Sequence, residues 1–288
     1  MDIALLEMLA KSGLREGEEG SFGLPLNGIE RIKIDVGLSL DAPHSISWLQ
    51  NDPNLLVIGF EPVKECIESV QALLQQEDMQ NVRDRFVLIQ CALSDHNGEA
   101  PFFVTEDFGT SSLESPLGFA SRRIEAVQVF RLDDIAEALD FGTITRVDYL
   151  KTDCQGHDLR VLEGASKLLE RTAVVTCEAW APGYDMPRVD SELQITNFLN
   201  RLGFASLNRK STWRIHLSSF LHNSKMLSLL RPKLENAFVR IAKVRKTAIA
   251  DEVGGHLPPK LGASDPTFLN SRFLNSFHKG EISYYQTF

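Results

Sequence analysis

The sequence has few cysteines, and no two of them lie close together. Its 288 residues include only four, and none forms the Cys-x-x-Cys spacing that is typical of zinc sites and redox motifs. This absence argues against a zinc centre or a disulfide framework. We expect reduced thiols in the protein core, as is common in reducing compartments, at Cys66, Cys91, Cys154 and Cys177.

The chain also lacks an excess of basic residues, a long apolar run and the features of a secretory signal. Its 30 Lys and Arg residues face 39 Asp and Glu residues, which gives a formal net charge of −9. Such a balance disfavours general binding to nucleic acid or to anionic lipid. No stretch approaches the roughly 18 consecutive apolar residues of a membrane-spanning helix. We expect a cytoplasmic protein with no nucleic-acid or membrane partner.

What the sequence does contain is a regular alternation from position 31 onward. Short β-branched segments follow amphipathic ones, which predicts an α/β fold with a mostly parallel central sheet and helices on both faces. Helices are expected after Pro62, over 195–202, and after Asp158, whose side chain is a candidate N-terminal cap. Strands are expected over 31–37, 55–62, 85–95, 146–156, 173–180 and 203–209.

Changes in composition divide the chain into regions. We expect an N-terminal helical arm over 1–28 and the main domain over 29–214. The domain holds an insertion over 98–130, with a short strand pair inside it. A basic helical region over 215–247 and an irregular tail over 248–288 follow. The basic residues favour a solvated helix face over an anionic partner.

Glycines are scarce in the turn after the first predicted strand. Nucleotide-binding loops usually have several, but this turn has Gly37 followed by Ser39 and Asp41. A pyrophosphate must approach backbone amides closely, and Asp41 would repel it. Asp35, in contrast, would attract a cation. The turn therefore favours S-adenosylmethionine, which has an ammonium and a sulfonium but no phosphate.

An acidic residue closes the second predicted strand. Ligands of open parallel sheets bind at the carboxyl ends of the strands, and Glu61 lies at such an end, just before Pro62. A carboxylate at this point can accept hydrogen bonds from two adjacent ribose hydroxyls. The alternative is an acid that only stabilises the start of a helix.

The ends of the fourth and fifth predicted strands carry the candidate catalytic residues: Lys151, Asp153, His157 and Glu178. Asp153 is expected to face the transferred group and to orient a nucleophile or a metal ion. His157 is a candidate base because imidazole titrates near neutral pH, although such a histidine is more often a surface residue. Lys151 has either an active-site role or the task of neutralising a carboxylate. The carboxylates would also suit Mg²⁺, but no spacing in the sequence indicates a metal ion.

Several short fragments occur in a fixed order: IDVGLS, VIGFEP, CALSD, SSL, VFRLDDI and VDYLKTDCQGHDLRVLEGA. Together, over about residues 31–180, they resemble the FkbM-type family of S-adenosylmethionine-dependent methyltransferases. The resemblance implies a Rossmann-like class I methyltransferase fold. It also implies cofactor contacts at Asp35, Gly37, Ser39, Glu61, Pro62, Ala92, Leu93, Ser94, Ser111 and Ser112.

The sequence departs from the family pattern at two places. The turn GLSLDAP has no second glycine, which bears on the contacts to the amino-acid end of the cofactor. Gln155, His157 and Asp158 stand where Glu-Gly-x-Glu is usual, which bears on a charged contact at the fourth strand.

The leading hypothesis is an O-methyltransferase that acts on a hydroxyl of a sugar, a glycan or another small metabolite. One alternative is a degenerate domain that binds S-adenosylmethionine without turnover, and another is a nicotinamide-dependent oxidoreductase, which rests only on Glu61 and the strand order. No motif identifies the acceptor or the oligomeric state. Aromatic residues of the insertion and of the start of the C-terminal region are candidates for a wall of the acceptor pocket or for core packing: Phe102, Phe103, Phe108, Phe119 and Trp213.

Overall fold

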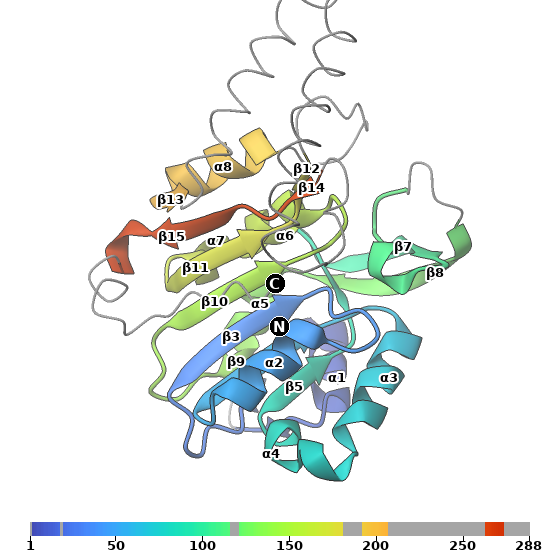
Figure 1. Cartoon of the computed structure of the whole chain (residues 1–288), viewed down its shortest axis with the longest axis vertical. Helices are drawn as coiled ribbons and strands as arrows, with labels where there is room; N and C mark the ends of the chain where they lie inside the picture. The colour runs from blue at the N-terminus through green and yellow to red at the C-terminus, as the bar shows by residue number, and fades with distance from the viewer. Residues whose placement is uncertain (1, 18–19, 116–120, 181–191, 207–262, 274–288) are drawn as a thin grey trace, which may run out of the picture.

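A seven-stranded sheet forms the centre of the computed structural model, which describes residues 2–17, 20–115, 121–180, 192–206 and 263–273 (Figure 1). Strand order across the sheet is β13-β15-β11-β10-β3-β4-β5. All neighbours from β11 to β5 are parallel, and β15 is antiparallel to both of its neighbours. The predicted α/β fold with a mostly parallel sheet is thus confirmed. The strands are β3 (Arg31–Val36), β4 (Leu55–Phe60), β5 (Phe86–Ile89), β10 (Val147–Thr152), β11 (Thr172–Cys177), β13 (Phe204–Ser206) and β15 (Thr267–Asn270).

The winding direction of the sheet switches between β3 and β10. The chain runs outward from β3 through β4 to β5 and then crosses back to β10, which pairs with the other side of β3. This register sets Lys151 opposite Asp35, so the polar residues at the carboxyl ends of these two strands meet. Such a switch point is where open α/β sheets bind their ligands.

Helices cover both faces of the sheet because alternate strand residues point to opposite sides. One face carries Val57 and Tyr149 and packs against α2, α3 and α4. The other face carries Ile34 and Leu150 and packs against α1, α5, α6, α7 and α8. The helices are α1 (Ile3–Lys11), α2 (Pro43–Asn51), α3 (Lys64–Leu74), α4 (Gln80–Arg83), α5 (Leu132–Ala138), α6 (Asp158–Glu163), α7 (Ser166–Leu169) and α8 (Glu192–Arg201), with 3-10 turns at Glu77–Met79, Phe108–Thr110 and Ser271–Phe273.

Asp158 does not cap the helix that follows β10, so that prediction was wrong. The cap position belongs to His157, and no side chain caps the helix. Asp158 instead accepts hydrogen bonds from Thr152 Oγ1 at 2.6 Å and from the Cys154 backbone N–H at 3.3 Å. Complete burial raises the pKa of Asp158 to about 7. Its role is to hold the loop between β10 and α6 in place.

The insertion is a long antiparallel hairpin that projects beside the sheet, made of β7 (Gly98–Thr105) and β8 (Ser121–Phe130) (Figure 1). The predicted strand pair is therefore confirmed, with longer strands than expected. The third predicted strand, in contrast, is divided: β5 ends at Ile89, and β6 (Ala92–Leu93) pairs with β8 instead of the main sheet. The chain thus leaves the central sheet beside the carboxyl end of β4.

The tail contributes a strand, although irregular structure was expected there. Thr267–Asn270 forms β15, which pairs with both β11 and β13, and its Phe268 is fully buried. Just before it, β14 (Ala263–Ser264) pairs with β12 (Ala179–Trp180). The basic region, Phe119, Trp213 and the end of the sixth predicted strand lie outside the described residues.

The N-terminal arm joins the main core. Leu5 and Leu9 of α1 are buried in the same cluster as the sheet residues. Two short strands follow, and the second pairs with a segment after α5: β1 (Arg15–Glu16), β2 (Phe22–Gly23) and β9 (Leu139–Asp140). In the described ranges, no helix combines the length and the apolar character needed to cross a membrane. The four cysteines are free thiols, and three of them are buried, as predicted for core residues.

Candidate active site

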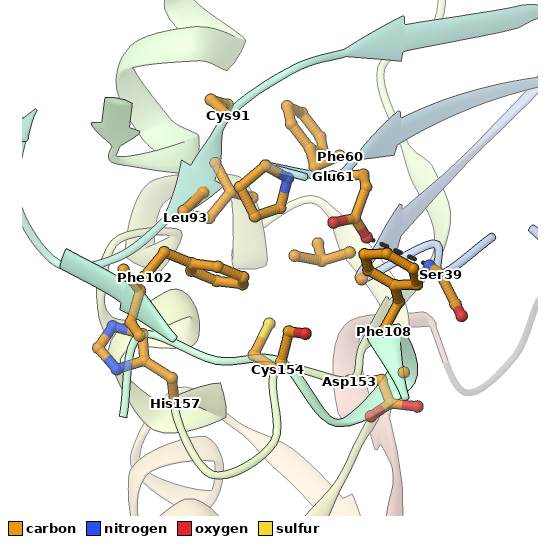
Figure 2. Close-up of a pocket in the computed structure, with 17 residues that line it drawn as sticks. Ser39, Phe60, Glu61, Cys91, Leu93, Phe102, Phe108, Asp153, Cys154 and His157 are labelled. Atoms are coloured by element: carbon orange, nitrogen blue, oxygen red, sulfur yellow. Dashed lines mark hydrogen bonds between the residues drawn. The ribbon is translucent and has the colours of Figure 1, made fainter. Parts of the chain in front are cut away.

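A cavity of about 120 Å³ lies at the carboxyl ends of β3, β4 and β10, and the insertion completes its wall (Figure 2). Most of the residues predicted for the site line it: Gly37, Ser39, Glu61, Pro62, Ala92, Leu93, Ser111, Asp153 and His157. The others lie outside the lining: Asp35, Ser94, Ser112, Lys151 and Glu178. The apolar part of the wall includes Phe60, Phe102 and Phe108.

Glu61 holds the first loop against the end of β4. Its Oε2 accepts the backbone N–H groups of Leu38 at 3.1 Å and Ser39 at 3.2 Å, and its Oε1 accepts that of Val63 at 3.0 Å. Burial, opposed in part by these hydrogen bonds, raises the pKa of Glu61 to about 7. Because a carboxylate offers about four acceptor positions, about one remains for a ligand.

The first loop has the backbone shape of a glycine-rich turn although it has one glycine. Gly37 has a φ of 83°, and a Cβ at this position would lie 2.2 Å from the carbonyl oxygen of Asp153. Ser39 also has a left-handed φ, 58°, as does Ala42, 42°. Such a conformation costs an L-residue about 1 kcal/mol or more. The loop therefore carries backbone strain at Ser39 and Ala42.

Asp35, Lys151 and Asp153 form a charge group behind the loop, in which Asp35 and Lys151 are buried and Asp153 is partly exposed. Asp35 is 1% exposed, and its Oδ2 accepts a hydrogen bond from Ser45 Oγ at 2.7 Å. Lys151 Nζ lies 3.4 Å from Asp35 Oδ1 and 3.7 Å from Asp153 Oδ2. Although burial opposes its charge, the two carboxylates raise the pKa of Lys151. This geometry fits the neutralising role considered for Lys151.

His157 is buried, 8% exposed, so the expectation of a surface histidine was wrong. Its Nε2 lies 2.9 Å from Ser94 Oγ, and its Nδ1 lies 2.9 Å from Glu114 Oε1. Ser94 is itself fully buried. With both ring nitrogens engaged, His157 cannot accept a substrate proton without giving up one of these hydrogen bonds. Glu114, which sequence reasoning missed, lies 43 positions away in the insertion.

The two serines have different contacts. Ser111 Oγ accepts the backbone N–H of Thr105 at 3.1 Å, within the insertion, and Ser111 lines the cavity. Ser112 Oγ donates to the carbonyl oxygen of Cys154 at 2.8 Å. Ser112 thus holds the insertion against the loop that follows β10.

Glu178 is attached to β10 through its backbone, whose N–H donates to Thr152 O at 3.0 Å, but it is not part of the cavity wall. Within the described ranges, no group of three or more His, Cys, Asp and Glu side chains is arranged to hold a metal ion. The structure thus offers no support for the Mg²⁺ site considered from the sequence.

Two residues that sequence reasoning missed lie near the charge group. His44, in the first turn of α2, interacts electrostatically with Lys151, Asp35 and Asp153. Asp265, just before β15, interacts with Asp153, Lys151 and His44. The proline that precedes His44 in the sequence was the available signal, because proline is favoured in the first turn of a helix. No local signal marks Asp265.

Comparisons with solved structures give weak likenesses to methyltransferases. A methyltransferase FkbM from Methylobacillus flagellatus KT is 15% identical over 69% of this chain and 40% of its own length, with a TM-score of 0.39. A precorrin-6y C5,15-methyltransferase from Geobacter metallireducens GS-15 is 12% identical over 67% of this chain and 78% of its own, with a TM-score of 0.34. The N-terminal domain of EvdMO1 with SAH bound is 11% identical over 64% and 70%, also with 0.34. This chain therefore spans less than half of the Methylobacillus flagellatus protein, and these scores are too low to support a function.

The sequence itself matches a family model. A comparison with curated proteins found no match. The model of the methyltransferase FkbM domain, however, matches residues 32–205, which is more than half of the chain and includes β3 to β13. The matched region contains the first loop, Glu61, the insertion and the residues after β10. The fold is the Rossmann-like class I methyltransferase fold, and the chain belongs to the FkbM methyltransferase family.

Proposed function

We propose that this chain is an S-adenosylmethionine-dependent methyltransferase that methylates a hydroxyl of a sugar, a glycan or another small metabolite. The observation that carries the proposal is the buried carboxylate of Glu61 in the cavity wall, with Asp35 and Asp153 at the neighbouring strand ends. This set suits a ligand that combines ribose hydroxyls with positive charge. Family membership supports the transfer of a methyl group.

The residues of the cavity fit the parts of this cofactor. The remaining acceptor position of Glu61 suits a ribose hydroxyl. Leu93 and Phe102 offer an apolar surface for adenine, and the acidic strand ends beyond Gly37 suit the charged end. When bound, the cofactor supplies an electrophilic methyl group on a sulfonium. The chain orients the acceptor beside it, and positioning of two reactants can supply roughly 7–11 kcal/mol of the barrier.

Binding requires the insertion to move outward. The cavity of about 120 Å³ is smaller than the roughly 300 Å³ at the lower end of ligand pockets. Phe108 and Gly109 form part of its wall, and a Cβ on Gly109 would lie 3.5 Å from Ser39 Oγ. The short turn that carries these two residues therefore closes the cavity against the first loop. Its displacement would open the space that the cofactor needs.

A dinucleotide fits this site poorly. The amides of Leu38 and Ser39, which would have to bind a pyrophosphate, already donate to Glu61. A phosphate would displace this carboxylate or lie against it, and both cost electrostatic energy. The altered first loop, which motivated the alternative of a degenerate domain, is not itself evidence for one, because Ser39 adopts a left-handed backbone, with a φ of 58°, without being a glycine.

Isothermal titration calorimetry tests the proposal. We expect the full chain to bind S-adenosylmethionine with micromolar affinity and Glu61→Gln to bind it at least about tenfold more weakly, since a charged hydrogen bond contributes about 1.5–3 kcal/mol. Glu99→Gln, an exposed change on β7, is the matched control and should bind like the wild type. Absence of heat at millimolar cofactor would refute the proposal. Release of S-adenosylhomocysteine with hydroxyl compounds separates an enzyme from a degenerate binding domain.

A further inference from the structure

Titratable side chains that interact electrostatically gather around Asp153, in what we name the outer cluster: His44, Lys151, Asp153 and Asp265. Asp153 is the member that also lines the cavity. It lies at the opposite end of the cavity from Cys91 and Leu93, as Figure 2 shows. The outer cluster therefore adjoins the end of the cavity that is opposite the proposed adenine site at Leu93.

Packing of α2 on the sheet determines where His44 lies. Ser45 Oγ donates to Asp35 at 2.7 Å, and the ring of Trp48 meets that of Tyr149 edge-on, with 5.2 Å between centroids. These contacts fix the first turns of α2 across β3 and β10. His44 lies one turn nearer the N-terminus of α2 than Trp48, and the centroids of the two rings are 6.0 Å apart. The imidazole is thus held at the end of α2 that faces the strand ends.

Asp265 is placed by the sheet as well. The carbonyl oxygen of Pro266 accepts the backbone N–H of Cys177 at 3.4 Å, and Thr267 Oγ1 lies 2.9 Å from Thr176 Oγ1. These contacts bring the start of β15 to the carboxyl end of β11, next to β10. Asp265 is therefore held near Asp153, Lys151 and His44, with which it interacts electrostatically.

A buried ion pair lies at the edge of the outer cluster. Asp35 is 1% exposed, and its Oδ1 lies 3.4 Å from Lys151 Nζ. The same ammonium lies 3.7 Å from Asp153 Oδ2. Lys151 therefore links Asp35 to Asp153, the residue that the outer cluster shares with the cavity wall.

The state of His44 suits a proton acceptor. Burial, and then the charge of Lys151, lower its pKa, although Asp35, Asp153 and Asp265 act in the opposite direction. At neutral pH the ring is therefore mostly neutral, and one of its nitrogens carries a lone pair that can accept a proton. The surrounding carboxylates would repel an anionic acceptor and can accept hydrogen bonds from a neutral hydroxyl compound.

We propose that His44 is the general base of the methyl transfer and that the acceptor hydroxyl binds between His44 and Asp153. This inference rests on the proposed function. The hydroxyl proton passes to a ring nitrogen of His44, while the oxygen forms a bond to the methyl carbon. The carbon–sulfur bond breaks with its electrons on sulfur, which gives a methyl ether and S-adenosylhomocysteine. The imidazolium then releases its proton to Asp265 or to water.

Proton NMR of the histidine rings in the full chain tests this assignment without a known acceptor. The His44 signal is identified by its loss in His44→Gln, and its pKa is measured in complexes with S-adenosylmethionine and S-adenosylhomocysteine. These ligands differ in the charge of the sulfur. If His44 lies beside the methyl group, we expect its pKa to be about 0.5–1 unit lower with S-adenosylmethionine, because a unit charge several ångströms away has this effect at intermediate dielectric.

Other outcomes separate this inference from the proposed function. Equal His44 pKa values in the two complexes would overturn the assignment of His44 as the base. If both values were also higher than in the free protein, His44 would lie beside the cofactor carboxylate. A loss of cofactor affinity in His44→Gln greater than about threefold would also overturn it, because a base for the acceptor contributes little to cofactor binding. If neither ligand binds, the proposed function itself fails. His96, whose side chain is 59% exposed, is the internal reference and should not differ between complexes.

Discussion

Asp153 stands between two regions that differ in how far their polar side chains are hydrogen-bonded within the protein. On the cavity side, His157 contacts both Ser94 and Glu114, and Glu61 accepts three backbone N–H groups. These groups are satisfied before any ligand arrives. The cavity side is therefore a preorganised wall, in which histidine and glutamate hold loops in position.

The outer side is charged but less completely bonded. His44 interacts with its neighbours through electrostatics, and Asp35 Oδ1 accepts no hydrogen bond from the described residues. Two histidines near one aspartate thus differ in bonding: both ring nitrogens of His157 contact protein groups, whereas His44 is the residue for which we propose proton exchange. Burial and bonding, more than residue type, separate a structural histidine from a chemical one.

The largest expected effect on stability comes from Gly37, which packs against Asp153, the residue between the two regions. Gly37→Ala should lower the free energy of unfolding by about 3 kcal/mol or more, because its Cβ would lie 2.2 Å from the carbonyl oxygen of Asp153. Gly28→Ala is the matched control: its φ is also positive, 74°, but nothing lies within 4 Å of the added Cβ. That control should lose about 1 kcal/mol in urea unfolding. Equal losses of stability in the two variants would mean that the protein shifts to accommodate the added Cβ at Gly37 without an energetic cost.

The second effect separates the two histidines. His157→Gln should lower the free energy of unfolding by about 1–3 kcal/mol, because it leaves the buried groups of Ser94 and Glu114 poorly paired. His44→Gln, at a half-buried site, should change it by less than about 0.5 kcal/mol. Urea unfolding of both variants gives the comparison. A larger loss of unfolding free energy in His44→Gln than in His157→Gln would mean that His44, and not His157, has the structural role.

The central part of the fold could be predicted because its signals are local. The apolar run Leu55–Phe60 is a strand buried along its whole length, and it is recognisable within a few residues. The four residues of β15 carry too short a signal, and their partners β11 and β13 lie at least 60 positions earlier in the chain. Their pairing depends on the finished core.

The site was predictable to the same extent. Gly37, Glu61 and Asp153 lie at strand ends that the sequence marks, and all three line the cavity. The bonding of His157 was not predictable, because Glu114 is 43 positions away and Ser94 is 63. His44 was missed for another reason: the proline before it is a weak signal for the start of α2, and the left-handed residues of the preceding turn are not glycines.

The third effect is a pH dependence of cofactor affinity on the cavity side. Burial raises the pKa of Glu61 to about 7, so this group becomes ionised as the pH rises from 6 to 8. Affinity for S-adenosylmethionine should increase about tenfold over this range, since the ionised fraction rises from about one tenth to about nine tenths. Glu61→Gln should lack this increase and serves to subtract the titration of the cofactor's own amine. Parallel calorimetric profiles for the two proteins would contradict this prediction.

The smallest effect concerns the residue at which the first loop departs from the family pattern. Ser39→Gly should raise the free energy of unfolding by about 0.5–1 kcal/mol, because Ser39 has a φ of 58° and glycine adopts this backbone without a steric penalty. Cofactor affinity should stay within about twofold, since the Ser39 amide that binds Glu61 is kept. Thermal and urea unfolding measure the stability. A decrease would mean that the serine side chain, which lies near Gly109, contributes more to the closed loop than its backbone strain costs.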